Sequence, residues 1–234
     1  MVVPVCNEAE NVDPLAREIH AAMSARAYEM IFVDDGSTDD TAANLAKLKR
    51  EFPTLRVLRH SFRSGQSAAV ASGVRAARAA WIATLDGDGQ NDPADIPRLI
   101  ESRDAPVGRG VQLFMGNRTT RKDTPFRRLQ SRIANGVRGS LLGDGTPDTG
   151  CGIKLFAREV FLDLPRFDHM HRFLPALFQR QGARVISVPV NHRPRMRGTS
   201  KYGMLNRLWV GIVDIFGVMW LRRRYKPGLT VREE

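Results

Sequence analysis

Short apolar runs alternate with longer segments of helical periodicity over the first half of the chain. Four runs, at residues 2–5, 30–33, 55–58 and 81–85, have the length and composition of buried strands and are bounded by turn-forming residues. After the first run, apolar side chains recur every three or four positions over residues 12–22, as on the inner face of a helix. This alternation of strand and helix predicts an α/β fold with a doubly wound, mostly parallel sheet.

The second half of the chain has a less regular pattern. Strands are predicted at residues 113–116 and 184–190, and a helix at residues 127–142. We see no internal repeat, low-complexity segment or long linker that would split the chain. We therefore expect one domain over residues 1–203, followed by a segment of different character at residues 204–234.

This last segment combines an apolar helix face with many cations. The apolar run at residues 208–221 is too short to span a bilayer, and it contains Asp214. Arg222, Arg223 and Arg224 follow it directly, and an amphipathic helix beside a basic cluster suits a membrane interface with anionic headgroups. The alternative is a terminal helix that packs on the core and carries a solvated basic tail. The expected apolar face consists of Leu208, Trp209, Ile212, Ile215, Phe216, Met219 and Trp220.

The charge balance predicts anionic partners. The chain has 36 Lys and Arg against 25 Asp and Glu, a net charge of +11, which favours nucleic acid, anionic lipid or a phosphorylated substrate. Cys6 and Cys151 have neither metal-site spacing nor the pattern of a disulfide framework. Because no signal peptide and no transmembrane run is visible, we expect a cytoplasmic protein, or one bound peripherally at the cytoplasmic face of a membrane.

Two carboxylates one residue apart follow the fourth apolar run. Gly87 lets the backbone turn between Asp86 and Asp88, so both can reach one hard cation, Mg²⁺ or Mn²⁺. Gln90 adds a neutral oxygen donor nearby. An isolated Asp-x-Asp is more often a simple polar turn, so the interpretation depends on the rest of the chain.

Polar residues also follow the first two predicted strands. Asn7 and Glu8 come after the first strand, and Asp34 and Asp35 come after the second. Ligands of open α/β sheets bind outside the carboxyl ends of the strands, which meet at one edge. We therefore expect these side chains to lie beside Asp86 and to form a site for a metal ion and a diphosphate.

Together these features resemble glycosyltransferase family 2, whose members have the GT-A fold. The closest likeness is to enzymes that use dolichyl or polyprenyl phosphate, including the dolichol-phosphate mannosyltransferases. The matching signatures occur in family order over residues 2–203. They are VPVCNE (3–8), VDDGS (33–37), DGDGQ (86–90), DTG (148–150) and GTSKY (198–202).

The resemblance implies roles for individual residues. The implied nucleotide contacts are Pro4, Cys6, Glu8, Val33, Asp35 and Gly87, with Cys6 standing where family members often carry tyrosine. The implied metal ligands are Asp86, Asp88 and Gln90. Arg118 and Lys201 would meet the donor phosphates, and the implied contacts of the acceptor phosphate are Arg127, Ser131 and Arg195. Arg193 and Arg197 are near enough in sequence to replace Arg195.

The resemblance further implies an activity for a GT-A catalytic domain at residues 1–203. The expected reaction is inverting transfer of a hexose, mannose first, from GDP-mannose or a UDP-sugar to dolichyl or polyprenyl phosphate. Such an acceptor phosphate is largely ionised at neutral pH, so no strong general base is required. This agrees with the lack of a catalytic histidine constellation, since His169 and His171 suit a surface or acceptor loop. Many family members carry transmembrane helices or a membrane partner protein, so the mode of membrane attachment stays open.

Four alternatives compete with this interpretation. The closest is a family 2 glycosyltransferase that acts on a soluble or saccharide acceptor. A phospho-receiver module would explain Asp34, Asp35 and Asp86, but it would not explain the second half of the chain. A nucleic-acid-binding protein would explain the charge, but no helix-turn-helix, zinc or RNA-binding signature is present. A nucleotidyltransferase usually has a Gly-rich phosphate loop after its first strand, which this chain lacks.

Overall fold

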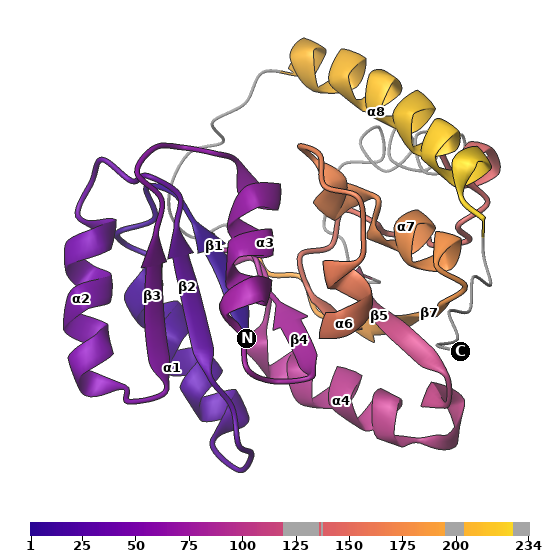
Figure 1. Ribbon diagram of the computed structural model, residues 1–234. Helices are drawn as coiled ribbons and strands as arrows, with labels where there is room; N and C mark the ends of the chain where they lie inside the picture. Colours follow the sequence, from indigo (N-terminus) through magenta and orange to yellow (C-terminus); the bar gives the residue numbers. More distant parts are fainter. Residues whose placement is uncertain (119–135, 137, 195–203, 227–234) are drawn as a thin grey trace, which may run out of the picture.

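The structure is a seven-stranded sheet with helices on both faces (Figure 1). It is a computed structural model that describes residues 1–118, 136, 138–194 and 204–226. The strand order is β3-β2-β1-β4-β6-β5-β7, and every pairing is parallel except those of β6 with β4 and β5. The predicted mostly parallel α/β sheet is therefore confirmed. The strands are β1 (Val2–Val5), β2 (Met30–Asp34), β3 (Leu55–Arg59), β4 (Trp81–Thr84), β5 (Val111–Arg118), β6 (Lys154–Ala157) and β7 (Arg184–Val190).

Two apolar clusters hold the helices against the sheet. On one face pack α1 (Val12–Met23), α2 (Thr41–Glu51) and α4 (Ile96–Asp104). On the other face pack α3 (Gln66–Ala76), α6 (Arg158–Leu162) and α7 (Leu174–Arg180). Apolar side chains at helical spacing explain this, because burying one stripe removes it from water. Short 3₁₀ turns occur at η1 (Pro93–Asp95), η2 (Pro106–Gly108) and η3 (Met170–Arg172).

The sequence pattern differs from the structure mainly in the second half. The strand β6 was not predicted, because it has four residues and begins with the charged Lys154. It pairs antiparallel with Trp81–Thr84 and with the middle of β5. The helix predicted at residues 127–142 lies largely outside the described residues, although 138–142 are helical.

The helix α8 (Met204–Arg224) has one packed side and one exposed side. Val218 is fully buried, and Ile215 packs with the cluster that contains α7. Among the described helices, none combines the length and hydropathy needed to cross a bilayer. Figure 1 shows α8 lying over α7, on the side of the molecule where β1, β2 and β3 end. The large apolar side chains on its exposed side are Ile212, Val213, Phe216 and Trp220.

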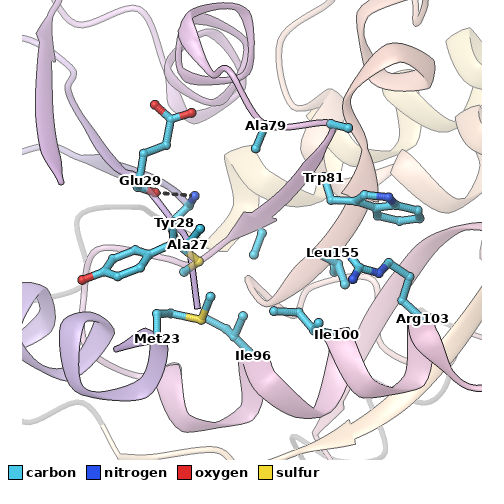
Figure 2. A pocket seen from close by; sticks show the side chains of 13 residues that line it. Met23, Ala27, Tyr28, Glu29, Ala79, Trp81, Ile96, Ile100, Arg103 and Leu155 are labelled. Atoms are coloured by element: carbon cyan, nitrogen blue, oxygen red, sulfur yellow. Dashed lines mark hydrogen bonds between the residues drawn. The ribbon is translucent and has the colours of Figure 1, made fainter. Parts of the chain in front are cut away.

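A cavity of about 260 Å³ opens at the opposite edge, where the strands begin (Figure 2). Apolar side chains of α1 and α4, such as Met23 and Ile100, line it. The guanidinium of Arg103 lies 5.3 Å from the centroid of the Trp81 ring at its rim. The length of the strands separates this mainly apolar cavity from the polar clusters, so we do not assign the expected chemistry to it.

Candidate active site

The loops after β1 and β2 are joined by hydrogen bonds at the carboxyl edge of the sheet. The parallel register pairs Val5 with Asp34, which brings the residues that follow them side by side. The backbone N–H of Asn7 donates to the hydroxyl of Ser37 at 2.9 Å, and Thr38 N–H donates to the Asn7 side chain at 2.8 Å. Asn7 has φ of 54°, a left-handed conformation that asparagine tolerates better than most residues. The predicted convergence of these two clusters is therefore present.

Asp35 lies at the centre of this edge with three donors on its carboxylate. One oxygen, Oδ1, accepts from His60 Nδ1 at 2.7 Å and from Ser64 N–H at 2.8 Å. The other, Oδ2, accepts from Gly65 N–H at 2.8 Å. The Asp35 side chain is 5% exposed, so these bonds hold a buried charge in one orientation.

Other residues expected to contact a nucleotide surround Asp35. Glu8 accepts a hydrogen bond from the Asn11 side chain at 2.6 Å, and its backbone N–H donates to Thr41 at 2.8 Å. Pro4 pairs in register with Val33, and both lie buried beneath this edge, so their expected nucleotide contacts remain predictions. Cys6 is partly exposed in the loop after β1.

The two carboxylates of the DGDGQ signature lie directly after β4. Asp86 N–H donates to Asn91 Oδ1 at 2.9 Å, and Gln66 Nε2 donates to Asp86 Oδ1 at 2.8 Å. Asp88 Oδ1 accepts from the backbone N–H of Gln90 at 3.1 Å, which closes a tight turn. Only glycine fits at position 87, because a Cβ there would lie 2.8 Å from the carbonyl oxygen of Pro4.

The electrostatics around Asp86 fit a cation site. Burial raises the pKa of Asp86, Lys154 opposes this rise, and Asp88 adds to it. Burial lowers the pKa of Lys154, whose ammonium donates to the carbonyl oxygen of Cys151. A divalent cation would relieve the cost of two neighbouring carboxylates with hard oxygen ligands. Over the described residues, no set of three or more His, Cys, Asp or Glu converges, so the two aspartates would need further ligands such as Gln90, the substrate or water.

Arg118 ends β5 with its guanidinium already paired. Its Nε lies 2.7 Å and its Nη2 2.8 Å from the two carboxylate oxygens of Asp148, the first residue of the DTG signature. Burial opposes the charge, but these hydrogen bonds outweigh it and raise the pKa of Arg118. The pair therefore fixes the orientation of Arg118, and its expected contact with phosphate remains a prediction.

Three residues of this edge were not predicted from the sequence. Gln66 donates to Asp86, His60 bonds to Asp35, and Lys154 lines a small pocket together with Asp86. Nothing in their local sequence marks them, because their partners are 20 or more positions away. A small pocket beside these groups is lined by Pro4, Gln66, Val70, Thr84, Leu85, Asp86, Gly152, Lys154, His171 and Leu174.

The two histidines of the DHMHR segment face different partners. His171 points inward, where its Nδ1 lies 2.8 Å from the hydroxyl of Ser67, and burial lowers its pKa well below the ordinary value. His171 is thus partly exposed rather than fully at the surface, and its expected role in a surface or acceptor loop stays a prediction. His169 has φ of 63°, and its Nδ1 lies 3.4 Å from Asp214 of α8.

The residues expected to bind the acceptor lie outside the part of the chain that the structure describes. Arg127, Ser131, Arg195 and Lys201 all lie outside the described residues, as does Arg197. Among the described residues, Arg193 forms ion pairs with Glu18 at 2.6 Å and with Asp92 at 2.7 Å. Its backbone N–H donates to the carbonyl oxygen of Gln90 at 3.1 Å, so the segment that leads to residue 195 begins beside the carboxylate pair.

The fold and this edge define a glycosyltransferase of the GT-A class, and comparison with known proteins gives the family. The chain belongs to glycosyltransferase family 2, whose model, described as "Glycosyl transferase family 2", matches residues 1–164. It is 37% identical to a dodecaprenyl-phosphate galacturonate synthase of Rhizobium johnstonii, over 97% of this chain and 68% of that protein. It is 33% identical to an undecaprenyl-phosphate 4-deoxy-4-formamido-L-arabinose transferase of Edwardsiella ictaluri, over 88% of this chain and 63% of that protein. The chain thus spans about two thirds of the length of these relatives.

Solved structures confirm the predicted GT-A fold. The structure is similar to glucosyl-3-phosphoglycerate synthase from Mycobacterium tuberculosis in complex with Mg²⁺ and UDP, with a TM-score of 0.72 and 19% identity over 94% of this chain and 77% of that chain. It is also similar to mannosyl-3-phosphoglycerate synthase from Rubrobacter xylanophilus, with a TM-score of 0.70 and 17% identity over 98% of this chain and 77% of that chain. At these identities the likeness concerns the fold alone.

Proposed function

We propose that this chain transfers a sugar, with inversion, from a nucleoside diphosphate sugar to a polyprenyl phosphate. The observation that carries the proposal is the convergence of Asp35 with Asp86 and Asp88 at one sheet edge of a family 2 chain. The two relatives described above are both named for transfer to a polyprenyl phosphate, which supports the acceptor class.

In this proposal the donor lies across the edge between β1 and β4. Asp35 and the loop after β1 would hold the nucleoside, since that loop carries hydrogen-bonding groups joined to the loop after β2. Asp86 and Asp88, with Gln90, would hold Mg²⁺ or Mn²⁺, which neutralises charge on the departing nucleoside diphosphate when bound. Arg118, oriented by Asp148, would donate to the same phosphate oxygens.

The acceptor would approach from the side of α8. A lipid phosphate monoester is a nucleophile in its ionised form, so the protein must orient it rather than deprotonate it. We assign that orientation to Arg127, Ser131 and Arg195, with Lys201 serving the donor phosphates. The exposed apolar side of α8 and the arginines at its end would rest on the cytoplasmic surface of a membrane, close to the lipid phosphate.

The most specific part of the proposal is the identity of the transferred sugar. The sequence resemblance favours mannose, but the two relatives are named for galacturonate and for formamido-arabinose. We therefore rank UDP-galacturonate before GDP-mannose as the first donor to test. The buried cation Lys154 beside Asp86 is compatible with a donor that carries an additional negative charge.

The test is a product assay with the full chain. Purified protein is incubated with Mg²⁺ or Mn²⁺, a short polyprenyl phosphate in detergent, and each of a panel of UDP- and GDP-sugars. We expect one donor to yield a lipid of the mass of polyprenyl-phosphate sugar, and Asp88→Asn to lower its formation by about 10² or more. Sugar transfer only to a soluble phosphate or saccharide would refute the lipid acceptor, and full activity of Asp88→Asn or in excess chelator would refute the metal site.

A further inference from the structure

The turn between β3 and α3 holds Asp35 more firmly than a surface carboxylate would require. His60, Ser64 and Gly65 all belong to this turn, and each supplies one donor to Asp35. Gly65 has φ of 92°, a conformation that glycine adopts without strain. The two oxygens of Asp35 are thus fixed by a segment 25 to 30 positions further along the chain.

The same turn lies directly against the VDDGS signature. Gly36 has φ of 68°, and a Cβ at that position would lie 2.7 Å from the backbone N of Arg63 and from the carbonyl carbon of Phe62. The backbone N–H of His60 also donates to the carbonyl oxygen of Asp34 at 2.8 Å. The turn is therefore packed on the backbone around Asp35 as well as bonded to its side chain.

His60 connects Asp35 to the next helix. Its Nδ1 lies 2.7 Å from Asp35 Oδ1, and its Nε2 lies 2.9 Å from the hydroxyl of Ser72 in α3. An ionised carboxylate accepts only, so Nδ1 donates to Asp35, while Nε2 shares a hydrogen bond with the hydroxyl of Ser72. The ring, just after β3, thus links the residue that follows β2 to helix α3.

We propose that His60 is a positioning residue for donor recognition, which acts by holding the Asp35 carboxylate toward the nucleoside. This inference rests on the proposed function, since it assumes that Asp35 meets the donor. Without the bond from His60, Asp35 keeps one backbone donor on each oxygen but loses the side-chain donor on Oδ1, so its carboxylate is held less firmly. A less firmly held carboxylate would weaken the nucleoside contact and leave the acceptor side unchanged.

Two substitutions separate the two bonds of His60. In His60→Asn the amide nitrogen occupies the place of Nδ1, so the bond to Asp35 can form while the bond to Ser72 is lost. In His60→Gln the amide nitrogen reaches the place of Nε2, so the bond to Ser72 can form while the bond to Asp35 is lost. The His60 side chain is 18% exposed and lines a solvent-open hollow with Ser64 and Arg75, so both polar side chains are sterically acceptable.

The experiment measures the KM of donor and acceptor, kcat, and the Kd of UDP and GDP with Mn²⁺ by calorimetry. We expect His60→Gln to raise the donor KM and the nucleotide Kd roughly tenfold, equivalent to about 1.4 kcal/mol, with an unchanged acceptor KM. His60→Asn should stay within about twofold of the wild type. The exposed His20→Gln, remote from this edge, controls for loss of a histidine as such.

Equal impairment of His60→Gln and His60→Asn, or equal impairment of donor and acceptor KM, would show a merely structural role and overturn the inference. If His60→Gln fails to fold, the two single variants Ser72→Ala and His60→Asn, which both lack only the bond to residue 72, test the inference instead. We then expect both to bind the nucleotide nearly normally, and a tenfold loss in either would overturn the inference. A wild-type chain that binds neither UDP nor GDP with Mn²⁺ would instead refute the proposed function, whereas normal binding by both wild type and His60→Gln would refute only the role of His60.

Discussion

Gly152→Ala should disable the carboxylate pair without unfolding the protein. Gly152 lies in the loop before β6, and its carbonyl oxygen accepts from Thr84 at 2.9 Å. A Cβ at this position would lie well under 3.0 Å from Asp86 Oδ2 and from Asn91 Oδ1, closer than real Cβ atoms approach. Asn91 Oδ1 is the acceptor that holds the backbone N–H of Asp86. The added methyl group would therefore clash with both the Asp86 carboxylate and the Asn91 side chain that holds the Asp86 backbone.

The magnitude follows from how far these groups must move. Neither neighbour is the end of a long flexible side chain, so restoring van der Waals contact displaces the Asp86 carboxylate by up to about 1 Å. A displacement of that size at a reacting centre costs about 10²-fold in rate. Overpacking of this kind costs about 1–3 kcal/mol of stability, which a domain of this size tolerates.

The assay compares kcat/KM, Mn²⁺ affinity and thermal unfolding of Gly152→Ala with those of Gly217→Ala. Gly217 lies on α8, and an added Cβ there meets nothing within 4 Å. We expect Gly152→Ala to lose about 10² in kcat/KM and to bind Mn²⁺ more weakly, while Gly217→Ala resembles the wild type. Wild-type activity and metal affinity in a folded Gly152→Ala would refute the reasoning.

Three further predictions concern the same molecule. Gln66→Leu removes the donor that orients Asp86, so kcat/KM should fall about 10-fold with little change in melting temperature, and an unchanged kcat/KM would contradict this. Glu29 is partly buried, but hydrogen bonds from a backbone amide and a neighbouring arginine outweigh burial and lower its pKa from 4.5. Its contribution to stability is therefore present above pH 4.5 and lost as the pH falls through the lowered pKa, so urea titrations should show a smaller loss at acid pH for Glu29→Gln than for the wild type. Trp220 is 58% exposed on α8, so Trp220→Glu should bind anionic liposomes about tenfold more weakly in co-sedimentation, whereas Val107→Glu, equally exposed but remote, should not; equal binding by all three proteins would count against the membrane-surface assignment.

The donor half of the fold could be predicted from the sequence because its signals are local. Each of the first four strands is a short apolar run with a turn signal behind it, and the DGDGQ signature stands at the end of one of them. The parallel order then places the polar residues that follow these strands on one edge, as the hydrogen bond between Asn7 and Ser37 shows.

The supporting residues could not be predicted in this way, because their roles depend on contacts between distant segments. His60 can bond to Asp35 only when β3 lies beside β2 in the folded sheet. Gln66 can donate to Asp86 only when α3 packs against β1. Lys154 is a buried cation at the start of a strand that was not predicted. Its burial makes sense only beside the carboxylate of Asp86, which no local pattern reveals.

The reversed direction of β6 has a consequence for how this fold can diversify. Because β6 runs against its neighbours, the chain departs from the sheet after Arg118 and returns at Lys154, with Met115 and Lys154 paired in register. The two ends of this connection therefore lie at one rim of the sheet, and its described last part carries Asp148 and Gly152 beside Arg118 and Asp86. A change in the length of such a connection costs little entropy, provided that Asp148 and Gly152 are kept, because Asp148 pairs with Arg118 and Gly152 lies against Asp86. We therefore expect a chimera that exchanges only the residues before Asp148 in this connection with those of another family member to keep the pairing of Arg118 and the packing against Asp86.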